Sequence, residues 1–118
     1  MTNKKPHAGR GGSSLHFEEG EVYFCAYFAD NDMLFPFVGS YVHIGKNVLG
    51  REKEATWYFQ DCESFARYGS FLGSVKADRQ ILGLTRDGAS NMVTLDELIP
   101  ELRRAEERRL ARGSRRAD

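Results

Sequence analysis

The chain has 118 residues, of which 41% are hydrophobic and 12% aromatic, and its 17 basic and 17 acidic residues give a net charge of zero. This length favours a single domain, and this hydrophobic content excludes a disordered protein. No apolar run approaches the ~20 residues that a membrane-spanning helix needs. No hydrophobic stretch follows the basic N-terminus, so we expect a cytoplasmic protein with no membrane partner.

The zero net charge hides an uneven distribution along the chain. Residues 13–100 carry 13 acidic and seven basic side chains. Residues 1–12 carry three basic side chains and no acidic one, and residues 101–118 carry seven arginines and four acidic residues. The sequence is therefore a mildly acidic body with basic ends, a layout that bears on partners rather than on fold.

Aromatic residues concentrate in runs that predict β-strands. All fourteen Phe, Tyr and Trp residues lie between Phe17 and Phe71. Residues 21–29 are apolar on both alternating faces, which is typical of a covered, central strand. The short polar residues at 30–32 predict a hairpin into the next strand. Because Pro36 cannot donate to a ladder, an edge or an irregularity is expected there.

Turn and cap signals predict the elements of the middle of the chain. A third strand at 55–60 ends at Asp61, whose carboxylate is placed to cap a short helix over 62–68. Gly69 is placed to end that helix in a left-handed conformation. Further along, Asp87-Gly88 is a hairpin signal and predicts a second antiparallel pair of strands.

The C-terminal part predicts a helix with a proline near its beginning. Thr94 and Glu97 form a capping-box pattern, and apolar residues follow at helical spacing. Pro100 removes a hydrogen bond from any helix that runs through it. Either the helix kinks there, or one turn at 95–99 precedes a new helix with Pro100 at its first position, and we favour the second arrangement.

Together these elements predict an α+β domain: an antiparallel sheet of about five strands, with a short middle helix and a C-terminal helix packed on one face. The expected strands are 21–29, 39–44, 55–60, 79–85 and 91–94. The expected organisation is a flexible basic arm at 1–15, a single domain at 16–105, and a charged helical or frayed tail at 106–118.

No residue pattern predicts catalysis, a metal site or a cofactor. Cys25 and Cys62 are expected to be free thiols. His43 is the one base that a neighbouring strand could offer to Cys25, but the apolar neighbours of Cys25 favour its neutral form. Asp61 and Glu63 flank Cys62 and oppose a reactive thiolate. The turn after His43 lacks the glycine spacing of a phosphate-binding loop.

Two sets of surface residues are candidates for binding. The first combines exposed aromatic and acidic side chains that would meet another protein, a basic one in particular. It comprises Tyr41, Trp57, Tyr58, Asp30, Asp32, Asp61 and Glu63. The second is an arginine-rich tail that would bind a polyanion through phosphate contacts. It comprises Arg108, Arg109, Arg112, Arg115 and Arg116.

These features favour a small, bacterial-type, non-enzymatic protein-binding module, of which an immunity or inhibitor protein against a basic toxin is one version. The alternatives are a homo-oligomeric accessory or structural protein with a self-complementary aromatic patch, and a nucleic-acid accessory protein that acts through its basic ends. The alternation of acids and arginines in the tail also fits a solvated helix with internal ion pairs, which disfavours nucleic acid as the partner.

Overall fold

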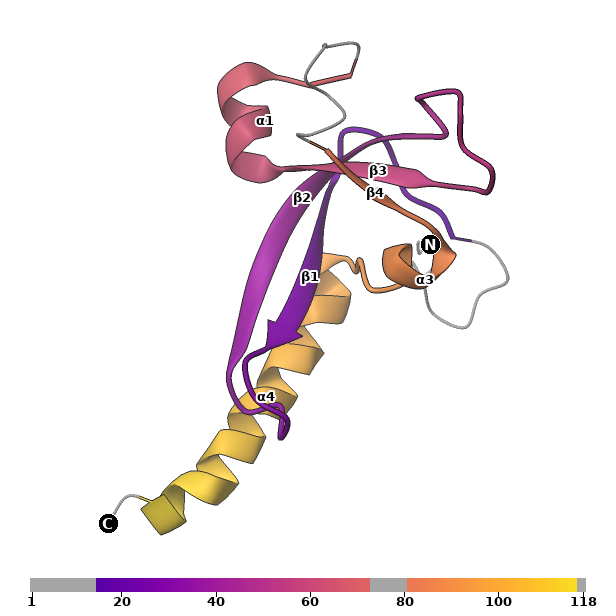
Figure 1. The fold of residues 1–118 in the computed structure, drawn as a ribbon. Helices are drawn as coiled ribbons and strands as arrows, with labels where there is room; N and C mark the ends of the chain where they lie inside the picture. The colour runs from indigo at the N-terminus through magenta and orange to yellow at the C-terminus, as the bar shows by residue number, and fades with distance from the viewer. Residues whose placement is uncertain (1–14, 73–80, 117–118) are drawn as a thin grey trace.

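The computed structural model describes residues 15–72 and 81–116, with side chains described as far as Gly113. This part of the chain has an α+β fold with one antiparallel sheet of four strands, in the order β1-β2-β3-β4 (Figure 1). The strands are β1 (Val22–Phe28), β2 (Pro36–Lys46), β3 (Trp57–Asp61) and β4 (Leu82–Leu84). The helices are α1 (Cys62–Tyr68), α3 (Arg86–Ala89) and α4 (Leu95–Arg116).

Strands β1 and β2 form the predicted hairpin, which is longer than the rest of the sheet. Asp30 fixes the turn because its carboxylate accepts the backbone N–H groups of Leu34 at 3.0 Å and Phe35 at 2.9 Å. Strand β3 pairs with β2 only over Tyr41–Lys46. Residues 24–40 therefore extend beyond the third strand, and we call this segment the outer hairpin (Figure 1).

Helix α1 begins and ends where the sequence predicts. The Asp61 carboxylate accepts the N–H of Ser64 at 2.9 Å, as an N-cap does. Gly69 ends the helix with a positive φ of 77°, but its ψ of -171° lies outside the left-handed conformation that the sequence predicts. Phe65 and Cys62 then pack on one face of the sheet. The prediction of one short middle helix is incomplete, because α3 forms a second one.

The predicted hairpin at Asp87-Gly88 is wrong, and the sheet has four strands rather than five. Residues 86–89 instead form the single turn α3, in which the N–H of Ala89 bonds to the carbonyl of Thr85 at 2.8 Å. Gly88 does not take the positive φ that a tight hairpin turn requires. The chain consequently leaves β4, and Val93 forms an isolated bridge with Phe24 at the other edge of the sheet.

Helix α4 runs without interruption through Pro100, so the predicted new start at this proline is wrong. The capping box closes first: the Glu97 carboxylate accepts the Thr94 N–H at 2.9 Å, and the Glu97 N–H donates back to the Thr94 hydroxyl at 3.3 Å. The apolar stripe then continues on the far side of the proline, where Ala105 is fully buried. Packing of this stripe outweighs the one hydrogen bond that the proline removes.

The sheet has a core on each face. On one face lies a cluster around Phe59, formed by Leu15, Phe17, Tyr23, Cys25, Trp57, Phe59, Ala89 and Met92. On the other face Val42, Ile44 and Tyr58 pack beneath α1. Residues 1–14 of the predicted arm lie outside the described residues, whereas Leu15, at its end, is buried.

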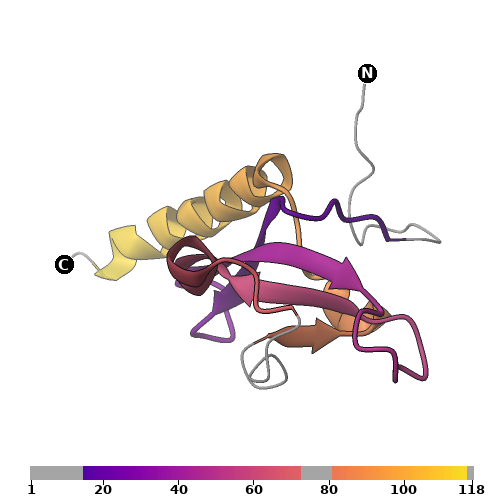
Figure 2. The ribbon, with the colours of Figure 1, turned by 90° about the horizontal axis from the view of Figure 1, so that it is seen from above.

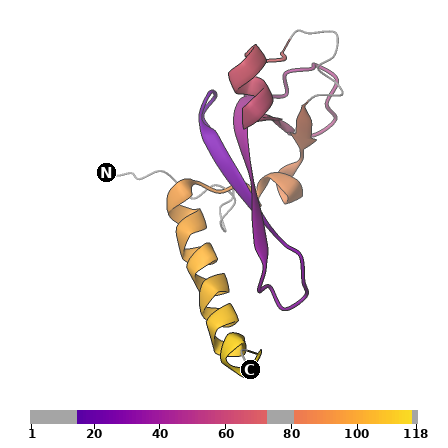
Figure 3. The ribbon, with the colours of Figure 1, turned by 90° about the vertical axis from the view of Figure 1, so that its left-hand side faces the viewer.

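Helix α4 packs along β1 rather than across the whole sheet. Figure 2 shows α4 on the side of the sheet opposite β4. Figure 3 shows α4 and the β1–β2 hairpin extending in the same direction, away from the rest of the sheet. The predicted tail, from residue 106 onward, continues this helix to Arg116. The molecule consequently has a two-core body and an elongated extension built from the outer hairpin and α4.

Candidate functional site

Two aromatic residues of the predicted partner surface are buried. Trp57 is 3% exposed and Tyr58 is 7% exposed, so neither offers contact area to a partner. The reason is the position of β3, which lies between β2 and β4 and is covered on both faces. The Lys46 Nζ atom lies 5.1 Å from the centroid of the Trp57 ring. The Tyr58 hydroxyl donates a hydrogen bond to the Glu52 carboxylate at 2.7 Å.

Tyr41 lies just inside the outer hairpin, at the inner end of a different aromatic group. Its ring covers Gly39 so closely that a Cβ built on this glycine would lie 2.8 Å from the ring. Tyr27 and Phe37, paired across the hairpin, have ring centroids 5.4 Å apart. By strand alternation, Tyr27, Phe37 and Tyr41 share one face of the hairpin. We call these three residues the aromatic face.

The aromatic face is accessible in the described structure. Phe37 is 59% exposed and Tyr27 is 41% exposed, while Tyr41 is half-buried. Hydrogen bonding of the Tyr27 hydroxyl to Cys25, together with burial and a bond to Tyr41, raises the pKa of Tyr27, so its phenol is neutral at physiological pH. The face therefore combines apolar ring surface with a neutral hydroxyl group.

The four acidic residues of the predicted surface do not form one cluster. Asp30 and Asp32 lie in the turn of the hairpin, whereas Asp61 and Glu63 lie at the beginning of α1 (Figure 1). Hydrogen bonds from Ser64 lower the pKa of Asp61, despite some opposing desolvation, and keep it ionised. Desolvation also opposes ionisation of Asp30, but the backbone N–H groups of its turn outweigh it and lower the pKa.

The arginines of the predicted polyanion-binding tail contact the turn of the hairpin. Arg108 donates to the carbonyl of Met33 at 2.9 and 2.6 Å, and Arg109 donates to the carbonyl of Leu34 at 2.7 Å. Arg112 pairs with Asp32 at 3.0 Å. We call these contacts the arginine clamp. Side chains of Arg115 and Arg116 lie outside the described residues.

The arginine clamp joins the two sets of residues that the sequence presented as separate candidate sites. Arg112 forms an ion pair with Asp32, and Arg108 and Arg109 donate hydrogen bonds to backbone carbonyl groups of the turn. The Arg108 Cζ atom also lies 5.6 Å from the centroid of the Phe28 ring, as in a cation–π contact. These arginines consequently have a structural role in holding α4 against the hairpin.

The candidate surface predicted from the sequence included neither Tyr27 nor Phe37. The unequal lengths of the strands could have indicated this surface. The two strands of the hairpin extend well beyond the five residues of β3, so a third strand cannot cover the outer hairpin. No charged residue occurs between Met33 and Gly45, which made this segment resemble a buried strand.

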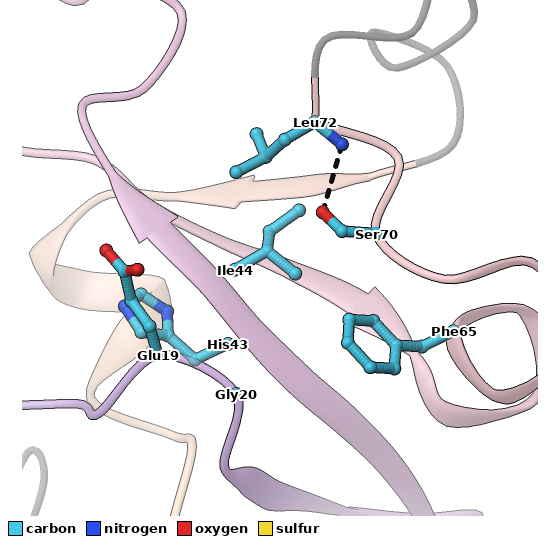
Figure 4. Close-up of a pocket in the computed structure, with 7 residues that line it drawn as sticks. All are labelled: Glu19, Gly20, His43, Ile44, Phe65, Ser70 and Leu72. Atoms are coloured by element: carbon cyan, nitrogen blue, oxygen red, sulfur yellow. Dashed lines mark hydrogen bonds between the residues drawn. The ribbon is translucent and has the colours of Figure 1, made fainter.

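His43 borders a hollow of about 320 Å³ on the body of the molecule (Figure 4). Its lining consists of Glu19, Gly20, His43, Ile44, Phe65, Ser70 and Leu72. The His43 Nδ1 atom lies 3.1 Å from the carbonyl oxygen of Tyr58, which accepts a hydrogen bond from the ring N–H. Burial lowers the pKa of His43, against the smaller raising effects of this carbonyl and of Glu19.

The described residues bring no thiol to His43. Cys25 is buried and pairs with Gly39, four residues from His43 along β2. Cys62, the first residue of α1, packs against the opposite core. Both thiols are free. Within residues 15–72 and 81–116, no group of three or more His, Cys, Asp or Glu side chains is arranged to hold a metal ion.

Comparison with protein-family models, curated proteins and solved structures finds no match to this chain. Across the described part of the chain, no helix has the length and apolar character that crossing a membrane requires. The candidate site is therefore defined by geometry alone, and the outer hairpin is a region where the fold leaves paired aromatic side chains exposed.

Proposed function

We propose that this protein is a non-catalytic protein-binding module whose aromatic face contacts another protein. The observation that carries the proposal is the exposure of Phe37 at 59% and of Tyr27 at 41%, side by side on a hairpin that is held in place from its turn. Exposed aromatic side chains on a rigid support are favoured anchors of protein interfaces, since they bury a large area and lose little conformational entropy.

Rigidity of the outer hairpin supports this proposal. The Asp30 carboxylate organises the turn, and the arginine clamp attaches that turn to α4. An isolated two-stranded hairpin is only marginally stable in water. Support of this kind maintains the aromatic rings in one arrangement before a partner arrives, which lowers the entropic cost of binding.

The acidic charge of the body favours a partner protein with a basic surface. Residues 13–100 carry 13 acidic and seven basic side chains, and Asp61 and Glu63 lie exposed near the inner end of the outer hairpin. An immunity or inhibitor protein for a basic toxin is the narrower form of this proposal. Complementary charge would accelerate association, while the aromatic face would supply the affinity.

Photo-crosslinking from the aromatic face tests the proposal. A benzophenone amino acid would replace Phe37 in one variant and Tyr68 in a control, because Tyr68 is 67% exposed on α1, away from the hairpin. We expect position 37 to crosslink in cells to one other protein and position 68 not to do so. Phe37→Ala should weaken binding to that protein at least tenfold, and Tyr68→Ala should leave it unchanged.

Two results would contradict the proposal. Equal crosslinking from both positions would mean that the aromatic face has no special role. Crosslinking of position 37 only to other copies of the same chain, with a matching dimer in sedimentation, would favour the homo-oligomeric alternative.

A further inference from the structure

The outer half of β2 has a strand neighbour on one side only. Residues 36–40 pair with β1, whereas pairing with β3 begins at Tyr41. No other strand pairing within residues 15–72 and 81–116 reaches this segment, since the one isolated bridge joins Phe24 to Val93. β2 consequently has an open edge five residues long, about 17 Å at the usual strand rise.

The register shows which backbone groups face that open edge. Ala29 donates to the carbonyl of Phe35, and His43 donates to the carbonyl of Glu21. Hydrogen-bonding positions alternate along an antiparallel pair, so the odd-numbered residues of β2 bond to β1. Val38 and Ser40 therefore direct both N–H and C=O away from β1, and Pro36 directs a carbonyl the same way.

This edge lacks the usual protection against pairing. Natural edge strands carry charged side chains or are covered by other elements. Here no charged residue occurs between Met33 and Gly45, and α4 packs along β1, on the other side of the hairpin. Pro36 blocks pairing only at the outer end, because it has no N–H group to donate.

We propose that the open edge of β2 binds an extended peptide segment of the partner protein, which adds a fifth strand beside Val38 and Ser40. This inference rests on the proposed function and names the form of the partner at the same hairpin. Val38 and Ser40 supply two donors and two acceptors, and the Pro36 carbonyl supplies a fifth group, so backbone pairing provides affinity. Side chains of the peptide that lie beside Phe37 and Val38 would be apolar.

Charge at the inner end of the edge specifies the peptide further. Asp61 pairs opposite Tyr41, at the point where the open edge stops, and Glu63 follows at the start of α1. Both side chains are exposed. The carboxylates favour a basic residue at the end of the peptide that reaches Asp61.

A second copy of the chain fits this edge less well than a peptide does. Pairing Val38 with Val38 of the second copy would bring Phe35 of that copy to the level of Tyr41, which Asp61 already occupies. In a shifted register, Val38 of each copy would lie opposite Pro36 of the other. Only two hydrogen bonds would then form between these residues, because proline has no N–H group to donate. A short peptide can end before it reaches Asp61.

Selection from a displayed library of random seven-residue peptides tests the inference on the full chain. We expect enriched peptides that alternate apolar residues and carry a Lys or Arg at one end. Val38→Pro should weaken their binding at least tenfold, since it removes an outward N–H group and leaves the ladder to β1 intact. Val38→Ile keeps that N–H group and an apolar branched side chain, and should bind as the unchanged protein does.

Amide exchange measured by NMR on the unchanged protein is independent of how the proline variant folds. In the free protein, the amides of Val38 and Ser40 should exchange at least tenfold faster than those of Phe37 and Gly39. The best selected peptide should slow the exchange of Val38 and Ser40. Absence of enrichment, or of this protection, would overturn the inference, as would protection that grows with protein concentration alone.

The same variants separate this inference from the proposed function. If the partner crosslinked through position 37 binds Val38→Pro as well as the unchanged protein but loses binding to Phe37→Ala, the edge is unused and the proposed function stands. If neither variant alters binding to that partner, both proposals fail.

Discussion

His43 illustrates how a single residue of the body depends on its surroundings. The side chain is 2% exposed, and its ring lies 5.5 Å from the Phe17 ring and 5.0 Å from the Phe59 ring. Its one hydrogen bond in the described structure joins Nδ1 to the Tyr58 carbonyl. Burial favours the neutral ring, so the folded protein binds a proton less readily than the unfolded chain does.

The stability of the protein should therefore fall as the pH drops below about 6.5, the ordinary pKa of histidine. The pKa of His43 is lowered in the folded state, so its contribution is complete above the unfolded-state value and is lost as the pH approaches the folded-state value. The loss is at most about 1.4 kcal/mol per pH unit for one proton. Urea denaturation between pH 5 and pH 7.5 measures it.

Two variants assign this pH dependence to His43. His43→Asn keeps a donor for the Tyr58 carbonyl and cannot titrate, so its stability should change less over this range. His16→Asn alters an exposed histidine that pairs with Glu18 and makes the smallest contribution to the lowered pKa of His43, so it should retain most of the dependence. Identical pH profiles of His43→Asn and the unchanged protein would contradict the prediction.

Among the elements, α4 and the hairpin stabilise each other from opposite ends of the chain. The guanidinium groups of Arg108 and Arg109 donate hydrogen bonds to the backbone carbonyl groups of Met33 and Leu34 in the turn. Leu34, whose carbonyl accepts from Arg109, is 7% exposed. The exposed Arg112–Asp32 pair contributes less, since ion pairs in water are worth little.

Arg109→Ala should lower the free energy of unfolding by about 1 to 2 kcal/mol, because it leaves the Leu34 carbonyl without its charged donor. Arg103→Ala is the matched control, since Arg103 is exposed and lies about 120° around α4 from Arg109 at 3.6 residues per turn. Urea denaturation compares the two variants. The prediction is wrong if both substitutions have the same effect.

Local signals predicted the elements of this fold better than its long-range contacts. The cap at Asp61 and the turn at Asp30 depend on bonds to residues within five positions, so the sequence indicated both. Trp57 was predicted to be exposed because only the sheet order reveals that β3 has neighbours on both sides. The clamp between Arg109 and Leu34 joins residues 75 positions apart and has no local signature.

At the scale of the whole molecule, the structure measures 55 × 32 × 26 Å, and its length comes from the outer hairpin and α4 (Figure 3). The body contains both cores, and its most buried aromatic residue, Phe59, is 0% exposed. The extension presents Phe37 to solvent. Under the proposed function, stability and partner binding thus depend on different parts of one chain.

A Phe→Ala substitution should change the stability of the protein by very different amounts in the body and in the extension. Phe59→Ala should cost about 3 to 5 kcal/mol of stability, since it leaves a cavity among packed rings. Phe37→Ala should change stability by less than about 0.5 kcal/mol, since the ring is largely exposed. Thermal and urea denaturation of both variants measure this. A large loss for Phe37→Ala would mean that the aromatic face serves folding rather than binding.

The separation of 75 residues between the turn and the arginines also has a consequence for biosynthesis. The hairpin requires only local pairing and can form soon after it leaves the ribosome, whereas the helix that fixes its turn is made much later. During that interval an uncharged strand edge and several aromatic rings are present without their support. We expect the nascent chain to be most prone to aggregation at this stage, and a chaperone that binds the hairpin then would prevent it.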